Sequence, residues 1–166
     1  LKKLRLCCRH IYRKGGIGLL KIEHLCKSYG DKKAVNDLSF KVKKGEFFAF
    51  LGVNGAGKST TINIICGQLS KDSGTVKICG RDSERDSDYI KRGIGVVFQN
   101  SVLDKELSVR DNLESRAALY GIRGAEFKKR LARLSALLDF EELLRRPVGK
   151  LSGGQRRRID IARALI

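Results

Sequence analysis

A glycine-rich stretch, residues 52–59, carries the clearest chemistry in this sequence. It reads GVNGAGKS and matches the pattern G-x-x-x-x-G-K-[ST] in full. Glycines let the backbone curl so that successive N–H groups point at a bound phosphate, and a following helix directs its N-terminal N–H groups at the same anion. Lys58 supplies a mobile cation for the β- and γ-phosphates, and the Ser59 hydroxyl can bind Mg²⁺. The predicted nucleotide-binding residues are Gly52, Val53, Asn54, Gly55, Ala56, Gly57, Lys58, Ser59 and Thr60.

A second glycine motif, residues 151–155, reads LSGGQ. A serine and two glycines at the start of a predicted helix form another surface suited to an anion. Three arginines follow at 156–158 and oppose the helix dipole. Two interpretations of these arginines are open: a phosphate lies near them, or they simply stay in solvent.

The first half of the chain contains the strands that must position the phosphate loop. Alternating apolar residues predict half-buried strands at 20–25 and 38–42, and a shorter strand is predicted at 75–79. The nearly continuous apolar runs 46–51 and 94–98 are typical of strands covered on both faces. A helix is predicted from Lys58 to Leu69, with an apolar stripe at Ile62, Ile65 and Leu69.

The second half of the chain is predicted to be helical. Ser108 and Asp111 form a capping signal for a helix that runs to about Tyr120. Leucines at helical spacing over 131–138 predict another helix, and a last helix is predicted to start near Ser152. That last helix would place Ile159, Ala162 and Ile166 on one face. No internal repeat is visible.

Length and composition set limits on the class of protein. The 166 residues suit one domain, and a hydrophobic share of 42% is too high for a disordered chain. No apolar run approaches the ~20 residues of a membrane helix. The net charge of +17 usually suggests nucleic acid, an anionic membrane surface or another polyanion. Residues 1–18 contain six basic and no acidic residues, and we predict that they form a flexible basic leader outside the fold.

The cysteines indicate no metal or disulfide framework. There are five, an odd number, and no pair shows zinc spacing. Because no secretory signal is present either, reduced thiols in a cytosolic protein are the simplest interpretation.

Taken together, LSGGQ and the loop GVNGAGKST resemble the nucleotide-binding subunit of ABC transporters. Gln99 follows the run IGVVF, like the glutamine of that family's Q-loop, and Tyr29 in KSYG resembles the aromatic residue that stacks on adenine. The resemblance covers about residues 19–166. The phosphate loop and the preceding KSYGDKKAVNDLSF are most similar to ATPases of bacterial drug and antibiotic exporters.

This resemblance implies an α/β fold: the P-loop NTPase core of an ABC ATPase, with an antiparallel β subdomain and a helical subdomain at about residues 100–150. Two such domains would bind two ATP molecules head to tail. Ser152, Gly153, Gly154 and Gln155 would then bind the nucleotide held by the phosphate loop of the second ATPase domain, identical or not. Closing and opening of this pair would drive an integral-membrane permease.

The resemblance also implies roles and a location. Lys58 and Gln99 would be the catalytic residues present, and Ser59 and Gln99 would contact Mg²⁺. The subunit would lie on the cytoplasmic face of the cell membrane, and no specific nucleic-acid partner is expected.

Hydrolysis of ATP needs a Walker-B carboxylate, which in this family follows the signature helix, and a still later histidine. The sequence reaches Ile166 before either, so we interpret it as a C-terminally incomplete copy that binds ATP without hydrolysing it alone. Asp139 follows leucines with helical spacing and Asp160 lies inside the last helix, so neither fits the Walker-B role. His10 and His24 precede the phosphate loop.

Two other functions stay open from the sequence. A non-transport ABC ATPase that acts on ribosomes or nucleic acid would account for the positive charge, although the paired domains or long insertions of such proteins are not seen. A non-functional truncated relic is the other alternative.

Overall fold

The structure is a computed structural model that describes residues 19–166. It contains two compact units, and the chain passes from the first to the second between Ile94 and Gly95. The predicted basic leader, residues 1–18, lies outside the described residues.

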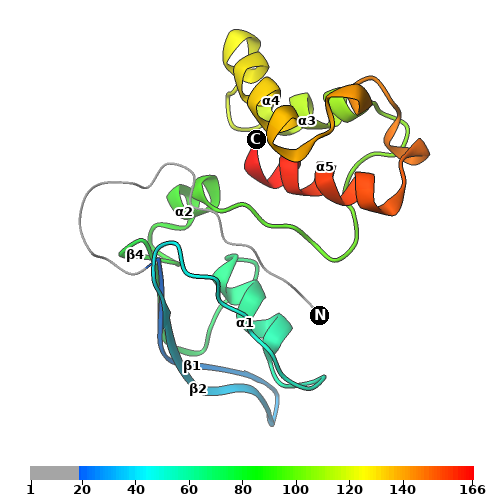
Figure 1. The fold of residues 1–166 in the computed structure, drawn as a ribbon. Helices are drawn as coiled ribbons and strands as arrows, with labels where there is room; N and C mark the ends of the chain where they lie inside the picture. Colours follow the sequence, from blue (N-terminus) through cyan, green and yellow to red (C-terminus); the bar gives the residue numbers. More distant parts are fainter. Residues whose placement is uncertain (1–18) are drawn as a thin grey trace. The chain divides into compact units, whose positions relative to one another are not determined.

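The first unit is built on a four-stranded antiparallel sheet with the strand order β2-β1-β3-β4. Figure 1 shows the long β1–β2 hairpin and the helix α1 that follows it. The elements of this unit are β1 (Leu20–Tyr29), β2 (Lys32–Val42), α1 (Lys58–Ile65), β3 (Ser73–Ile78), β4 (Arg81–Asp82) and α2 (Ser87–Gly93).

The predicted strands at 20–25, 38–42 and 75–79 are confirmed. Leu20, Ile22 and Leu25 are all buried in the core of this unit, together with residues of α1 and α2. The step from Ile22 to Leu25 breaks the two-residue period, and the structure accommodates it with a shift in register and a positive φ of 50° at His24. A bulge of this kind keeps the apolar residues on the core face.

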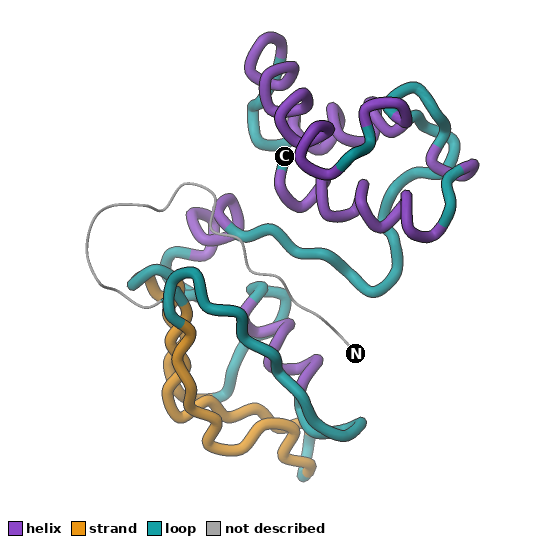
Figure 2. Tube along the Cα trace, viewed as in Figure 1, coloured by secondary structure: helices purple, strands orange, loops and turns teal. Residues whose placement is uncertain are grey.

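The prediction of strands in the two continuous apolar runs is wrong. Residues 46–51 are extended loop, drawn in teal between β2 and α1 in Figure 2, and residues 95–98 also lie outside any strand. The side chains of Phe47 and Leu51 are 78% and 68% exposed. A strand exists only where neighbouring backbones satisfy its N–H and C=O groups, and within residues 19–166 no strand pairs with these two segments.

Helix α1 is shorter than predicted. It ends at Ile65 rather than Leu69, because Gly67 adopts a positive φ of 66° two residues later. A glycine in this conformation is a common end to a helix. The buried face of α1 is made by Thr61, Ile64 and Ile65. Of the predicted stripe, Ile65 is buried and Leu69, beyond the end of the helix, packs against the same core, whereas Ile62 is only half-buried.

The second unit is helical, as predicted. Its elements are α3 (Val109–Ala118), α4 (Gly124–Leu138), α5 (Gly153–Leu165) and the short 3₁₀ turns Glu141–Leu143 and Val148–Lys150. The three α-helices, labelled in Figure 1, contact one another. Ile159, Ala162 and Ile166 are buried in their common core, so the predicted apolar face of the last helix is confirmed.

Ser108 caps α3, as the sequence predicts, and its hydroxyl accepts a hydrogen bond from the N–H of Asp111 at 3.1 Å. Changing Ser108 to alanine would leave that N–H without its partner. We expect Ser108→Ala to lower the free energy of unfolding by about 1 kcal/mol. Urea unfolding followed by circular dichroism measures this, with Ser115→Ala on the exposed side of α3 as the matched control. Equal stability of the two variants would contradict a capping role.

Candidate nucleotide-binding site

The phosphate loop ends where α1 begins. Gly57 is the N-cap of α1, no side chain caps the helix, and no acidic residue lies in its first turn. The first N–H groups of α1 therefore keep their capacity to bind an anion. Within the loop, Gly55 and Gly57 have positive φ values of 87° and 73°, and a hydrogen bond from Ala56 N–H to Val53 O closes the turn at 3.2 Å.

Lys58 turns its ammonium group back over the loop. Its Nζ donates a hydrogen bond to Gly52 O at 2.5 Å and another to Val53 O. These bonds hold the cation beside the loop backbone that the sequence predicts to surround a phosphate. A phosphate would offer this ammonium a charged partner in place of neutral carbonyls, and charge-assisted hydrogen bonds are about twice as strong.

The loop is anchored to the β1–β2 hairpin through Gly57. A Cβ atom at Gly57 would lie 2.1 Å from Ala34 O and 3.2 Å from the Val35 side chain, so only glycine fits between α1 and β2. Buried Thr61 strengthens this corner, since its hydroxyl donates to Gly57 O at 3.0 Å. The same hairpin therefore determines where the loop lies.

Tyr29 is at the turn of that hairpin, opposite Lys32, and is 53% exposed. An exposed aromatic ring on the element that carries the loop is available for stacking. Ser59 is exposed and Thr60 half-buried in the first turn of α1. All residues predicted on the phosphate side, together with Tyr29, thus belong to the first unit.

Residues 152–155 form a closed cap at the start of α5. The Ser152 hydroxyl accepts the N–H of Gln155 at 3.2 Å, and Gln155 Oε1 accepts the N–H of Ser152 at 2.9 Å. The side chains of both residues are therefore committed to the cap. Gly153 and Gly154 are exposed, and a Cβ atom at either position would meet no atom within 4 Å. Another molecule can approach the backbone closely there.

Gln99 is exposed in the second unit, at the end of the extended segment 95–98. It shares that unit with residues 152–155, and the phosphate loop belongs to the first unit. Within residues 19–166 no group of three or more His, Cys, Asp or Glu side chains could hold a metal ion.

A protein-family model matches most of the chain. The model described as "ABC transporter" matches residues 35–166, which include the phosphate loop, Gln99 and the LSGGQ motif. The chain belongs to the ABC transporter family.

Curated relatives of this ABC domain include named export proteins. The Nod factor export ATP-binding protein I of Ralstonia nicotianae is 38% identical over 152 residues, which are 92% of this chain and 47% of that protein. The linearmycin resistance ATP-binding protein LnrL of Bacillus subtilis is also 38% identical, over 89% of this chain and 48% of that protein. The chain thus spans about half the length of these relatives.

A solved structure supports the fold of the ABC domain. The structure of cbiO1 from Clostridium perfringens, part of the ABC transporter complex cbiONQ, superposes with a TM-score of 0.81. The alignment is 30% identical and covers 89% of this chain and 61% of that one. The α/β ABC ATPase fold predicted from the sequence is therefore confirmed. Among the described residues of this domain, no helix combines the length and apolar character needed to cross a membrane.

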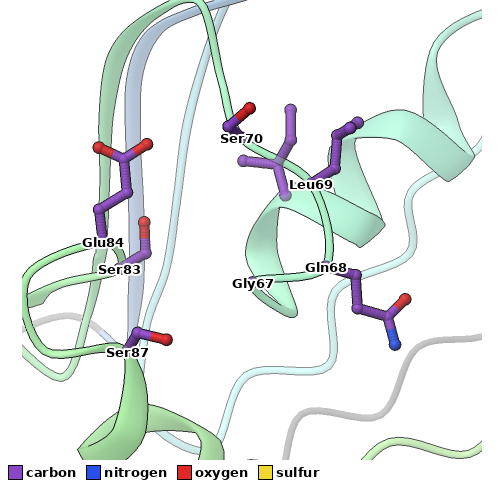
Figure 3. A pocket seen from close by; sticks show the side chains of 8 residues that line it. Gly67, Gln68, Leu69, Ser70, Ser83, Glu84 and Ser87 are labelled. Atoms are coloured by element: carbon purple, nitrogen blue, oxygen red, sulfur yellow. The ribbon is translucent and has the colours of Figure 1, made fainter.

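The first unit of the ABC domain also contains a cavity of about 300 Å³ (Figure 3). It lies beyond the C-terminal end of α1, whereas Lys58 begins that helix. Ser70, Ser83 and Ser87 contribute hydroxyl groups to its lining, and the lining residue Glu84 pairs with Lys71 at 2.5 Å. The cavity is therefore outside the predicted nucleotide site.

Sequence reasoning missed one contact near Gln99 in the ABC domain. Asp160, rejected above as a Walker-B carboxylate, is only 8% exposed and accepts a hydrogen bond from the Ser101 hydroxyl at 2.9 Å. The two residues are 59 positions apart, so no local pattern could reveal the contact. Helical spacing gave no signal either, because Asp160 is rotated by about 100° from Ile159 and lies off the predicted apolar face.

Burial raises the pKa of the Asp160 carboxyl above its ordinary value, against the opposing effects of the Ser101 hydrogen bond and of Arg157, Arg163 and Arg156. The folded state therefore binds this proton more tightly than the unfolded chain, and the resulting stability is lost as the pH rises through the raised pKa. The ionised carboxylate thus costs stability at neutral pH.

We expect Asp160→Asn to raise the midpoint of thermal unfolding at pH 7.5, because the amide keeps an oxygen for Ser101 and carries no charge. The gain should shrink as the pH is lowered to 4.5, because a lower pH favours the protonated form of the wild-type carboxyl, whose pKa is raised. Circular dichroism melts of both proteins at the two pH values test this, and a less stable variant at pH 7.5 would show that the arginines outweigh burial.

Proposed function

We propose that this chain provides the ATP-binding part of a subunit that powers an ABC exporter. The observation that carries the proposal is the phosphate loop: a glycine turn leads into a helix with no side-chain cap, and Lys58 lies against the loop carbonyls Gly52 O and Val53 O. These groups fit the β- and γ-phosphates of ATP. The relatives named for Nod factor export and linearmycin resistance support an export role.

Each predicted site residue of the first unit has a proposed role in binding MgATP. The loop N–H groups and Lys58 hold the phosphates, and Tyr29 stacks on the adenine ring. The Ser59 hydroxyl, with Thr60 beside it, contributes to the Mg²⁺ shell together with the phosphate oxygens. When bound, Mg²⁺ neutralises phosphate charge during transfer of the γ-phosphoryl group to water.

The residues of the second unit act on a nucleotide from outside its own phosphate loop. Ser152, Gly153, Gly154 and Gln155 contact the ATP of a second ABC ATPase domain in a head-to-tail pair. The open space at Gly153 and Gly154 supports this role, because a phosphate can come close to the backbone N–H groups there. Gln99 contacts Mg²⁺ or the attacking water and senses the membrane subunit.

Closing of the pair on ATP, and its opening after hydrolysis, drives an integral-membrane permease from the cytoplasmic face of the membrane. The second ATPase domain and the permease are the proposed protein partners.

Two measurements test this function. Isothermal titration with MgATP should give saturable binding that ADP competes away. A tagged subunit extracted from membranes with detergent should bring down an integral-membrane protein. Absence of nucleotide binding would refute the ATP-binding role. If single-stranded or duplex nucleic acid bound instead, with an affinity that falls steeply with salt, the non-transport alternative would be favoured.

A further inference from the structure

A cavity of about 370 Å³ in the second unit separates the segment that carries Gln99 from the first half of α5. Gln99, Asn100 and Ser101 line it from the segment, and Gly153, Arg157 and Asp160 line it from α5. Gln99, which is proposed to contact Mg²⁺ or the attacking water, and the start of the LSGGQ helix thus face the same space.

Two hydrogen bonds bridge the cavity, one on each side of Gln99 and Asn100. On the N-terminal side of Gln99, the Arg157 guanidinium group donates to Phe98 O at 2.5 Å. On the C-terminal side of Asn100, the Ser101 hydroxyl donates to Asp160 Oδ1 at 2.9 Å. Arg157 and Asp160 are three residues apart on α5 and so lie on one side of the helix.

The bridges determine where Gln99 lies within this unit. Among the described residues of the unit, neither Gln99 nor Asn100 has a hydrogen-bond partner of its own. Ser101 also accepts the N–H of Leu103 at 3.4 Å, which stiffens the turn after Gln99. The start of the segment is held as well, because Gly95 packs so closely on α5 that a Cβ atom there would lie 2.2 Å from Ala164 O.

We propose that Arg157 and Asp160 are positioning residues, which hold the Gln99 segment on α5 through Phe98 O and Ser101, so that Gln99 moves together with residues 152–155. The inference rests on the proposed function of Gln99. The two bridges couple two contacts through α5. One is the contact of Gln99 at its own domain's nucleotide, and the other is the contact of residues 152–155 with the nucleotide of the second ATPase domain. The bridge at Ser101 is tested first, because it joins two side chains and Asp160 is only 8% exposed.

The first test is steady-state ATP hydrolysis by the complete ATP-binding subunit, of which this chain is the proposed ATP-binding part, in complex with its permease. Ser101→Ala, which removes the donor, should lower kcat at least about tenfold, since misplacement of a positioned group by 1 Å can cost a factor of about 100. The KM for ATP should stay within about twofold, because the phosphate loop lies in the other unit. Ser101→Thr keeps the hydroxyl and Asp160→Asn keeps the acceptor, so both should retain at least about half of kcat. Ser115→Ala is the matched control.

The second test does not depend on activity. Hydrogen exchange at the amides of residues 99–103 in the same complex should be at least about tenfold faster in Ser101→Ala than in the wild type, and unchanged in the core of α3. Arg157→Ala should have a similar effect on this segment, and Arg157→Lys a smaller one. Arg133→Ala, at an exposed position of α4, is the control for loss of an arginine charge.

The outcomes separate the two levels of the hypothesis. Unchanged kcat and unchanged exchange in Ser101→Ala would overturn the positioning role while MgATP binding stands. If kcat and the ATP-binding stoichiometry of Ser101→Ala fell equally, the Ser101–Asp160 hydrogen bond would only keep the protein folded. That result would also overturn the positioning role. Failure of the wild type to bind MgATP refutes the proposed function itself, and the exchange measurement still decides whether the bridges hold the segment.

Discussion

Lys58→Ala should weaken the binding of MgATP by about 10- to 100-fold. The ammonium group of Lys58 lies against Gly52 O and Val53 O, and a bound phosphate would replace these neutral partners with charged ones. Its removal takes away charge-assisted hydrogen bonds worth about 1.5–3 kcal/mol. Isothermal titration with MgATP measures the change in Kd.

Lys77→Ala provides the matched control for Lys58→Ala. Lys77 lies on β3 in the same unit and is exposed, so its loss changes the net charge equally without touching the loop. The control should keep its affinity within about twofold. If both variants lost affinity equally, the effect would be one of net charge and the role of Lys58 in the loop would be refuted.

Gly57→Ala should disrupt both the fold of the first unit and its nucleotide site. The new methyl group would lie 2.1 Å from Ala34 O, and the residue would keep a φ of 73° that an L-amino acid adopts at a cost. Overpacking and this backbone strain together predict a loss of about 2–4 kcal/mol in the free energy of unfolding. Relief of the clash would move the loop away from β2, so MgATP binding should fall below detection.

The neighbouring Gly55 separates the two causes. It also has a positive φ, 87°, but a Cβ atom there would meet nothing within 4 Å. Gly55→Ala should therefore cost only the backbone strain, about 1 kcal/mol. Urea unfolding of the two variants side by side measures the difference. Equal losses would mean that the contact with Ala34 does not position the loop.

Much of the second unit could be predicted from local sequence. The caps at Ser108 and Ser152 and the apolar face at Ile159 and Ala162 follow from interactions within a few residues, and the structure has them. Helices close their backbone hydrogen bonds locally, so their signals survive in a single sequence. The end of α1 at Ile65 was missed because a positive φ at Gly67 outweighed the apolar spacing.

The apolar run at 46–51 shows where this reasoning fails. Continuous apolar residues predict a buried strand, but a strand depends on partners that are distant in sequence. No described residues pair with this run, and Phe47 and Leu51 stay exposed. The strands at 20–25 and 38–42 were predictable from their alternating apolar residues, and they pair with each other in the β1–β2 hairpin.

The sequence by itself determined the residues to which nucleotide binding is assigned in the proposed function. The spacing of Gly52, Gly57 and Lys58 and the pentapeptide at 151–155 are local patterns, because a phosphate is bound by consecutive backbone N–H groups. Only the tertiary structure decided that Ala34 leaves room for nothing but glycine at position 57, and that Asp160 reaches Ser101 across 59 residues. The physical reason is that close packing and buried hydrogen bonds join segments far apart in the chain, and no local periodicity records them.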